Sequence, residues 1–308
     1  TDPGVDILSI AAKYDIEEEF PEAVLEEVEK IPDHVLEHEY EGRRDLREEI
    51  IFTIDGADTK DIDDAISIEK LENNNYKLGV HIADVSYYVR ENTEIDKDAY
   101  LRGTSVYLAD RVIPMLPRQL SNGICSLNPD VDRLAMSCVM EIDEKGKVVD
   151  YEIFESVIKS KKQMTYTNVN KILEENIIPE GYEEFVDKLK LMGDCAKRLR
   201  KAKIKNGYID FEIEEAKLIV DDKGEVTEVT LRDRGTGEKL IEDFMVAANE
   251  TVASHIYYME LPFVYRVHGI PSEEKIQNFL KFVGVLGHRV NGKIKDLTPI
   301  SMQKLLDQ

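Results

Sequence analysis

The sequence lacks the features that mark membrane, secreted or disulfide-bonded proteins. No run of about 18 or more apolar residues occurs, so we expect no membrane-spanning helix. The first residues, TDPGVDIL, lack the basic and then apolar pattern of a signal peptide. The three cysteines, Cys125, Cys138 and Cys195, have no CxxC spacing. We therefore expect free thiols in a cytoplasmic protein, rather than a disulfide framework or a zinc site.

Positive charge is also scarce. The chain has 40 Lys and Arg residues against 63 Asp and Glu residues, which gives a net charge of −23. Taken alone, this balance argues against a nucleic-acid partner, because phosphate binding needs a basic surface. Basic residues nevertheless gather in KSKK at 159–162 and KRLRKAKIK at 197–205, whereas residues 16–50 are rich in glutamate. The acidic total is therefore compatible with a local phosphate-binding groove.

The pattern of turns and apolar residues predicts an α+β fold with a hairpin-rich mixed sheet surrounded by helices. Strands are expected near 48–54 and from 76 to 89, and helical spacing occurs over 5–30 and over a short segment that ends at Gly103. The chain contains no internal repeat. Three hairpins are predicted by Asn, Asp and Gly turn residues at 73–75, 143–146 and 221–224. The longer helices are expected at about 182–206, 238–260 and 272–287.

One loop concentrates carboxylates. The stretch IFTIDGADTKDIDDAISI, residues 51–68, contains four aspartates between strand-like apolar segments. They are Asp55, Asp61, Asp63 and Asp64. Carboxylates packed so closely repel one another, and each ionisation raises the pKa of the next group. A divalent cation relieves this repulsion, and oxygen ligands favour hard ions such as Mg²⁺ or Mn²⁺ over zinc. Such ions promote phosphodiester hydrolysis.

The acidic loop allows two other interpretations. An EF-hand calcium loop is excluded, because Ala65 and Ile66 occupy positions that need an oxygen ligand and a glycine. A solvated cluster of surface charge is the second alternative. The flanking apolar strands favour a rigid loop held against the core instead. In an extended segment Asp61 and Asp63 project to one side, and Gly56 lets the backbone turn back toward them.

Longer strings around the loop resemble a known family. TIDGADTKDIDDA, GVHIADVSYYV and RGTSVYLADRVIPMLPRQLSNGICSLNPDVDRLAMS resemble the ribonuclease II / ribonuclease R family and its RNB catalytic domain. The sequence resembles bacterial ribonuclease R more closely than ribonuclease II. The resemblance implies a Mg²⁺-dependent, processive 3′→5′ exoribonuclease of the exoribonuclease II type, with Mn²⁺ as a substitute ion. It implies hydrolysis of single-stranded RNA, and in the ribonuclease R branch also of structured RNA, to nucleoside 5′-monophosphates.

The resemblance also implies roles for the four aspartates, both in catalysis and in metal binding. Asp55 and Asp64 match the principal metal ligands, and Asp61 matches a residue that assists at the same ion or at a second one. Asp63 matches the residue that holds the attacking water or the second metal. We therefore expect substitution of Asp63 to harm turnover more than RNA binding.

Further residues match the family's RNA contacts. Tyr107 matches a tyrosine that stacks near the 3′-terminal nucleotide, and base–aromatic stacking contributes about 1–3 kcal/mol per base. Tyr166 and Phe211 match other nucleotide-contacting aromatics. Each of the three could instead be an ordinary core or strand aromatic. Glu242 matches a glutamate near the sugar, but Asp243 follows it where Glu is common, so either acid could contact RNA, and a solvated helix residue is the alternative. Glu242 and Tyr166 are the candidates for sensing the 2′-hydroxyl.

Basic residues after Tyr107 are candidates for phosphate contacts. They are Arg111, Arg118 and Arg133, of which at least one is expected to pair structurally with Asp110 or Asp132. The run at 197–205 is either an exposed helix face or an RNA contact. His81 is either a hydrogen-bonded core histidine or a residue that acts near Asp84.

The expected organisation is an acidic helical lead-in and connector at 1–47, followed at 48–308 by the N-terminal and central part of an RNB domain. Because the chain lacks an initiator Met and ends inside a helix that begins with Thr298 and Pro299, we expect a piece of a longer protein that is truncated at both ends, with the RNB domain C-terminally incomplete. The resemblance implies flanking OB-type RNA-binding domains, a monomer that binds RNA 3′ ends and no membrane, and little or no activity for this piece alone. The alternative is a non-catalytic RNA-binding relative.

Overall fold

The architecture is built on a five-stranded mixed sheet in the order β1–β8–β7–β4–β3. The computed structural model describes residues 5–109, 111–209, 216–221, 226–231, 234–267, 269, 271–288 and 299–306. The strands of the sheet are β1 (Arg44–Asp45), β8 (Val148–Lys159), β7 (Asp132–Ile142), β4 (Tyr76–Ala83) and β3 (Asp64–Lys70). All neighbours are antiparallel except β1 and β8, which are parallel. This mixed sheet confirms the predicted α+β fold.

The predicted hairpins are present because their turn residues suit the backbone. Asn74 adopts φ 65° in the β3–β4 turn, and Gly146 adopts φ 77° in the β7–β8 turn. Asparagine and glycine tolerate this left-handed region better than other residues. The third hairpin joins β10 (Ala216–Val220) to β11 (Val226–Leu231) in antiparallel pairing, and its turn at 222–225 lies outside the described residues.

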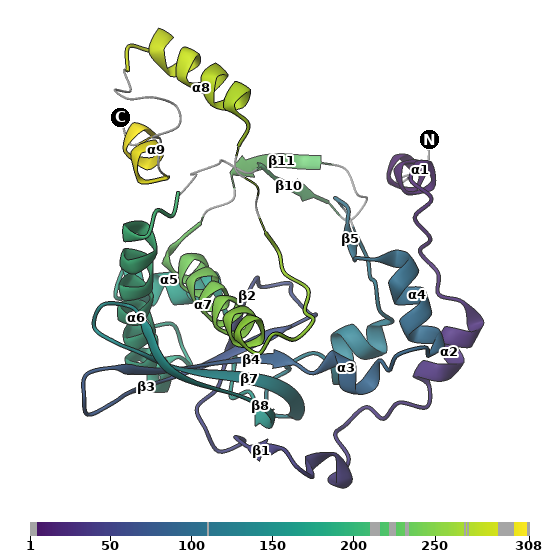
Figure 1. Ribbon diagram of the computed structural model, residues 1–308. Coiled ribbons are helices and arrows are strands. Elements are labelled where there is room, and N and C mark those ends of the chain that lie inside the picture. The colour runs from purple at the N-terminus through teal and green to yellow at the C-terminus, as the bar shows by residue number, and fades with distance from the viewer. Residues whose placement is uncertain are drawn as a thin grey trace.

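Three helices cover one face of the sheet (Figure 1). They are α5 (Tyr166–Glu174), α6 (Val186–Lys205) and α7 (Thr236–Tyr258). Phe52, Leu78 and Met140 from the sheet side form the main core with Leu189 of α6 and Phe244 of α7, and all five are fully buried. The predicted helix at 182–206 begins with a 3₁₀ turn, η3 (Glu183–Phe185), before α6.

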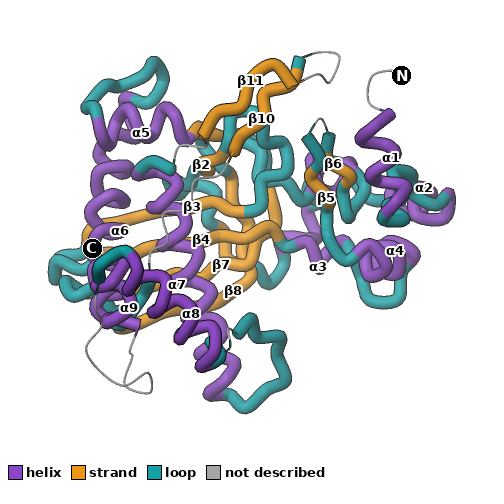
Figure 2. The backbone as a smooth tube through the Cα atoms, turned by 90° about the horizontal axis from the view of Figure 1, so that it is seen from above, coloured by secondary structure: helices purple, strands orange, loops and turns teal. Residues whose placement is uncertain are grey.

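Further helices and short strands lie before the sheet, between β4 and β7, and near the C-terminus. Figure 2 shows α1, α2, α3 and α4 beyond one end of the sheet, and α5 and α6 toward the other. The elements before the sheet are α1 (Val5–Lys13), α2 (Glu22–Val28) and η1 (Glu37–Tyr40). The elements between β4 and β7 are α3 (Val85–Tyr88), α4 (Glu94–Arg102), β5 (Val106–Tyr107), β6 (Val112–Ile113) and η2 (Leu120–Ile124). The C-terminal group is α8 (Glu273–Val285) and α9 (Pro299–Leu306). The helix predicted to end at Gly103 does so, with φ 71° at that residue, and Ser272 caps α8.

Three predicted elements need correction. The strand expected over 76–89 ends at Ala83, because Asp84 adopts φ −81° and ψ 69° and its carbonyl accepts the Tyr87 amide at 3.2 Å as the chain turns into α3. The strand expected at 48–54 is reduced to β2 (Thr53–Asp55), preceded by a single bridge between Phe52 and Ile66. The helical pattern over 5–30 forms two helices, because the intervening segment contains Asp15 at φ 53° and Pro21 before α2.

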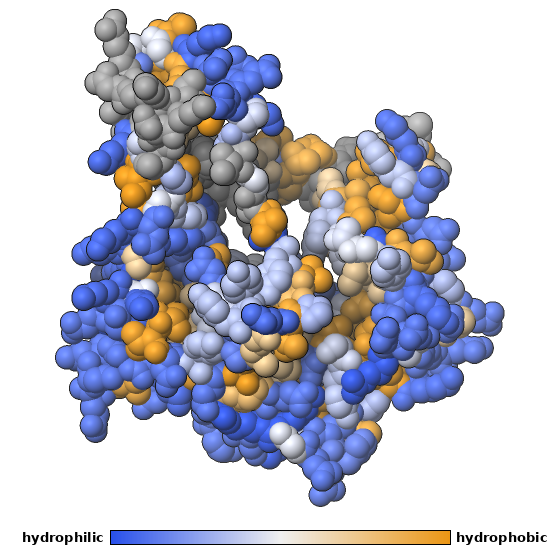
Figure 3. All heavy atoms as spheres, viewed as in Figure 1, coloured by the Kyte–Doolittle hydropathy of each residue, from blue (hydrophilic) through white to orange (hydrophobic). Residues whose placement is uncertain are grey.

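The surface agrees with the acidic composition. The face in Figure 3 is mostly hydrophilic, with apolar side chains in patches, and it is hollowed between the part that carries α6 and the part that carries α1. Within the described ranges, no helix has both the length and the apolar character that crossing a bilayer requires.

Candidate active site

The acidic loop connects two strands whose ends are fixed by pairing. Asp55 is the last residue of β2, which pairs in parallel with β9 (Gln163–Thr165) so that Asp55 lies opposite Thr165. Asp64 is the first residue of β3 and lies opposite Ile82 of β4. The two outer aspartates of the motif are therefore held by strand pairing, Asp55 in the two-stranded β2–β9 sheet and Asp64 in the five-stranded sheet, and residues 56–63 return the chain from one to the other.

The loop is also held from outside. The Ser126 hydroxyl donates to the Lys60 carbonyl at 2.8 Å and accepts the Ile62 amide at 3.1 Å. Ile62 is fully buried, and its neighbour Asp61 is half-buried. Further bonds run from the Gln163 side chain to the Thr59 carbonyl at 3.0 Å and from the Ala83 amide to the Asp63 carbonyl at 2.9 Å. These anchors support the rigid loop over a freely solvated cluster of charge.

Burial and mutual repulsion raise the pKa values of the aspartates. Burial, followed by the charges on Asp64 and Asp63, raises the pKa of Asp55 to about 7. Burial, followed by the charge on Asp63, raises the pKa of Asp61 to about 6 and that of Asp64 to about 6. Partial desolvation also raises the pKa of Asp63, which is the most exposed of the four. The four carboxylates are therefore electrostatic neighbours.

No positive side chain compensates this charge within the described ranges. None of the four carboxylates forms an ion pair with a described Lys, Arg or His residue. The Oδ2 atom of Asp55 is buried and has no hydrogen-bond partner. A buried carboxylate oxygen without a partner is costly, and a cation is the ligand that would satisfy it.

The donor set fits a hard divalent cation, because it consists of carboxylate oxygens alone. As the side chains stand, no three His, Cys, Asp or Glu side chains in the described part of the chain converge closely enough to hold one ion. Repulsion among like charges favours such separation, since each carboxylate raises the pKa of its neighbours. The assignment of Asp55, Asp61, Asp63 and Asp64 as metal ligands stays a prediction.

The predicted aromatic contacts lie in different places. Tyr166 begins α5 directly after Thr165, so the β2–β9 register brings it to the end of the strand that carries Asp55. Tyr107 lies on β5, away from the core, with 73% of its surface exposed. Phe211 lies outside the described residues. Tyr107 is therefore free to stack on a ligand, whereas Tyr166 also packs partly against the core.

The two acids of α7 have different surroundings. Asp243 is 3% exposed and accepts hydrogen bonds from Arg200 at 2.8 Å and Lys203 at 3.2 Å. Glu242 is less buried and pairs with Arg234 and Lys203. The basic run at 197–205 is thus partly engaged with α7, which neither predicted role described. Glu242 is the acid with more surface available to a ligand.

The remaining basic candidates differ in exposure. Arg133 is buried and donates to the carbonyls of Ser126 at 2.8 Å and Asp132 at 2.9 Å, so it is the structural arginine that was expected, with backbone oxygens as partners. Arg111 is half-exposed and pairs with Glu18 at 3.1 Å. Arg118 lines the same surface cavity as Arg111. Asp110, one of the two acids predicted to pair with these arginines, lies outside the described residues.

His81 is a core histidine. It is fully buried between the hydroxyls of Ser137 at 2.7 Å and Ser67 at 3.1 Å, and burial lowers the pKa of its imidazole to about 4. Asp84 is occupied by Arg43, at 2.6 Å in a buried ion pair. The structural alternative for His81 is therefore correct. The three cysteines are free and buried, as predicted.

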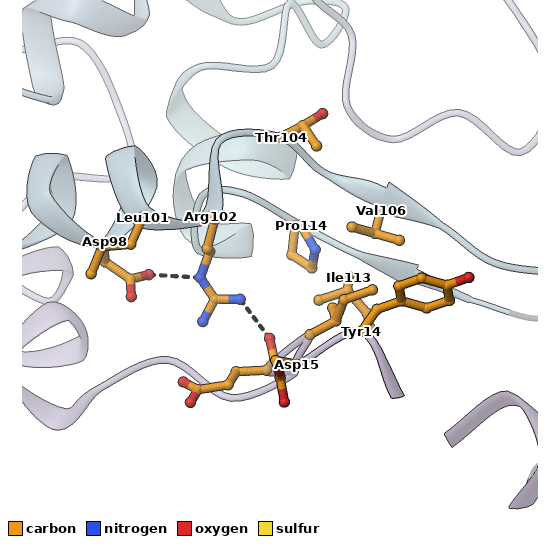
Figure 4. Close-up of a pocket in the computed structure, with 11 residues that line it drawn as sticks. Tyr14, Asp15, Asp98, Leu101, Arg102, Thr104, Val106, Ile113 and Pro114 are labelled. Atoms are coloured by element: carbon orange, nitrogen blue, oxygen red, sulfur yellow. Dashed lines mark hydrogen bonds and ion pairs between the residues drawn. The ribbon is translucent and has the colours of Figure 1, made fainter. Parts of the chain in front are cut away.

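A separate cavity beside the β5–β6 hairpin is closed by Arg102 of α4. Its guanidinium donates to the carboxylate of Asp98 at 2.7 Å and to the Glu17 carbonyl at 2.7 Å (Figure 4). It also donates to the Glu19 carbonyl at 2.6 Å. None of the four aspartates of the acidic loop lines this cavity. The contacts attach the N-terminal segment to α4 and are structural.

Sequence reasoning missed the residues that brace the loop. Ser126 and Gln163 contact it from positions more than sixty residues away in the chain, and the fully buried Thr53 on β2 has a hydroxyl without a hydrogen-bond partner. The only sequence signal was their occurrence in motifs that carried the family resemblance or in a strand.

Comparison with known proteins agrees with this arrangement. The RNB domain model matches residues 43–308. The chain is 50% identical to Ribonuclease R 1 of Lactococcus lactis over 94% of this chain and 36% of that protein. It is also 50% identical to Ribonuclease R of Thermotoga maritima, over 100% of this chain and 44% of that protein. The chain thus spans less than half the length of these relatives.

A solved structure is similar in fold. Mycoplasma genitalium RNase R in complex with ribose methylated single-stranded RNA superposes with a TM-score of 0.94 and 31% sequence identity. The match covers 99% of this chain and 48% of that one. The strand-to-loop aspartate motif, the mixed sheet and these matches lead to one conclusion: the chain belongs to the RNB domain family.

Proposed function

We propose that this chain supplies the catalytic carboxylates of a Mg²⁺-dependent, processive 3′→5′ exoribonuclease of the exoribonuclease II type. Its products would be nucleoside 5′-monophosphates from single-stranded RNA, and from structured RNA as in the ribonuclease R branch. The observation that carries the proposal is the group of four mutually repelling carboxylates without a positive partner, at a strand junction of the RNB fold. The relatives named Ribonuclease R support an exoribonuclease.

The proposal gives each aspartate a task. Asp55, with its unpartnered buried oxygen, and Asp64, fixed at the start of β3, would hold the ion, and Asp61 would assist. When bound, a divalent cation polarises water and offsets the negative charge of the phosphate. Asp63 is the most exposed of the four and would orient the attacking water by accepting its hydrogen bond. Mn²⁺ has similar ligand preferences and should substitute.

RNA would be held largely without regard to sequence. We assign Tyr107 to stacking on a base near the 3′ end, which its exposure permits. Tyr166 lies at the Asp55 end of β2 and, with Glu242, would contact the sugar and its 2′-hydroxyl. Phe211 and Arg111 are proposed as further contacts to a base and a phosphate.

The relatives are more than twice as long as this chain, so the proposal concerns the full-length protein. We propose that it acts as a cytoplasmic monomer, in keeping with the free buried thiols, and that OB-type domains flank the RNB domain. The present chain alone would then have little or no activity, because those domains would supply most of the contacts to RNA.

The test is turnover of 5′-labelled single-stranded RNA by the full-length protein. We expect Mg²⁺-dependent shortening from the 3′ end, release of nucleoside 5′-monophosphates and few intermediates of middle length. Asp63→Asn should lower kcat by at least about a hundredfold, as expected for a residue that orients the nucleophile, while the Kd for RNA changes little.

Asp58→Asn is the matched control, because Asp58 is an exposed acid of the same loop and its substitution removes the same charge. We expect near-normal turnover from that variant. Wild-type kcat in Asp63→Asn, or hydrolysis that persists unchanged in a chelator, would overturn the proposal.

A further inference from the structure

We propose that Ser126 and Arg133 form a positioning brace that holds the acidic loop in the conformation that binds the divalent cation. The inference rests on the proposed function and adds to it two residues that would touch neither metal nor RNA. Ser126 follows η2, and Arg133 lies near the start of β7, more than sixty residues after the loop.

The first step of the argument is the hydroxyl of Ser126. This residue is fully buried, and its Oγ atom donates to the Lys60 carbonyl at 2.8 Å while accepting the Ile62 amide at 3.1 Å. One side chain thereby fixes the backbone on both sides of Asp61. A third backbone contact, from the Leu127 amide to the Ile62 carbonyl at 2.9 Å, pairs the two segments directly.

The second step is the direction in which the aspartates project. Ile62 is fully buried in a cluster that includes Leu127. Neighbouring side chains in an extended segment point to opposite sides. Ile62 is buried, whereas Asp61 is half-buried and Asp63 is exposed, and this alternation would direct both carboxylates away from the core. The brace on the Ile62 backbone therefore controls the placement of two of the four carboxylates.

The third step is Arg133, which holds Ser126 in place. Its guanidinium is buried, and Nε donates to the Ser126 carbonyl at 2.8 Å, while Nη1 donates to the Asp132 carbonyl at 2.9 Å. Burying a charged group is costly unless its hydrogen bonds are made. Here one of the two bonds goes to the backbone of Ser126, the residue whose side chain holds the loop, which gives a chain of contacts from Arg133 through Ser126 to Ile62.

Groups that orient ligand-bearing side chains alter metal affinity without touching the ion, typically by about 10–100-fold on substitution. We therefore expect Ser126→Ala in the full-length protein to weaken Mn²⁺ binding by about tenfold or more. In the metal-free protein, hydrogen exchange of the Ile62 amide should accelerate, because that amide loses its acceptor. The Mg²⁺ concentration for half-maximal turnover should rise in parallel.

Ser156→Ala is the matched control. Ser156 is also a fully buried serine with two hydrogen bonds, to the Ser137 hydroxyl and the Ala135 carbonyl, and neither of these partners belongs to the acidic loop. We expect this variant to lose thermal stability while keeping wild-type Mn²⁺ affinity and Ile62 exchange. Ser126→Cys and Arg133→Lys, which keep weaker versions of the contacts, should lie between wild type and Ser126→Ala, and they provide folded variants if Ser126→Ala is unstable.

The measurements are Mn²⁺ titration followed by electron paramagnetic resonance, and hydrogen exchange of the segment that contains Ile62. Wild-type affinity in the Ser126 and Arg133 variants, or an equal loss of affinity in Ser156→Ala, would overturn the brace while leaving the proposed function in place. Failure of the wild-type protein to bind Mn²⁺ would instead overturn the proposed function, and the brace with it.

Discussion

Asp55 combines a fixed backbone with a carboxylate that lacks a partner. Its backbone ends a parallel strand pair, whereas its Oδ2 atom is buried without a partner. Burial and two neighbouring carboxylates raise its pKa to about 7, far above the ordinary value of 3.8. At neutral pH the fold therefore carries an unfavourable charge at this position, and a bound cation would remove the penalty.

This arrangement predicts a pH dependence for the metal-free protein. The pKa of Asp55 is raised to about 7 and those of Asp61 and Asp64 to about 6, so the folded state binds protons more tightly than the unfolded state. This tighter proton binding stabilises the folded state. The stabilisation is fully present below the ordinary aspartate pKa of 3.8 and is lost as the pH rises to about 7. Thermal unfolding in a chelator should therefore show a lower Tm at about pH 8 than at about pH 5.

Mg²⁺ should restore the Tm that the metal-free protein loses at the pH where the carboxylates are ionised. We expect it to raise the Tm at about pH 8 much more than at about pH 5, because protonated carboxyl groups bind the ion poorly. A double variant, Asp55→Asn with Asp64→Asn, should show a flatter pH profile and no Mg²⁺ effect. An identical profile in this variant and in the wild type would contradict the explanation.

The two acids of α7 should also differ in variants. Asp243→Asn leaves Arg200 and Lys203 without a buried counter-charge and should lower the free energy of unfolding by about 2 kcal/mol or more. Glu242→Gln removes a more exposed partner and should cost less than about 1 kcal/mol. RNA affinity should fall more in Glu242→Gln than in Asp243→Asn. Denaturant titration and RNA binding measure both effects, and equal stability losses would argue against separate roles.

At the scale of single residues, the sequence predicted chemical type better than partners. The free thiols and one structural arginine were predicted from composition and motif, whereas the metal-binding role of the four aspartates stays a prediction. The partner of Arg133 was not, because its buried guanidinium bonds backbone carbonyls, which no side-chain pattern reveals. His81 could not be separated from a functional histidine until Ser137 and Ser67 were seen on its two ring nitrogens.

At the scale of elements, locally encoded features were predicted well. The β3–β4 and β7–β8 hairpins depend on turn residues such as Asn74 and Gly146, whose backbone preferences act without tertiary help. The strand expected over 76–89 was wrong beyond Ala83, because the Asp84 carbonyl accepts the Tyr87 amide and the chain turns into α3. The β2–β9 pair, which places Tyr166 beside Asp55, joins segments too distant for any local pattern.

The β7–β8 turn offers a test of packing at this scale. A methyl group at Gly146 would lie 2.3 Å from the Arg198 carbonyl, in addition to the positive φ of 77°. Gly42 has a similar φ of 80° but open space around it. Gly42→Ala should cost about 1 kcal/mol from the backbone conformation alone.

Gly146→Ala should cost clearly more than Gly42→Ala, because α6 and the hairpin must move apart. Denaturant titration of both variants compares the two losses directly. A loss for Gly146→Ala no larger than that for Gly42→Ala would show that the close approach of the turn to α6 contributes little.

At the scale of the whole molecule, net charge and family membership point to different classes of partner. A net charge of −23 argued against nucleic acid, yet the chain belongs to a family whose relatives are named Ribonuclease R. The acidic lead-in is also attached to the domain, since Arg102 binds the carbonyls of Glu17 and Glu19, and Arg111 pairs with Glu18. Long-range contacts of this kind determine where charge is exposed, and total charge does not report them.

The central claim is that the carboxylates of the acidic loop hold a divalent cation. The most direct test is anomalous diffraction from crystals of the full-length protein soaked in Mn²⁺. The account predicts an anomalous peak in contact with the carboxylates of Asp55 and Asp64 that disappears in Asp64→Asn. Crystals of an active enzyme in which Mn²⁺ binds elsewhere, with these carboxylates directed into solvent, would contradict it.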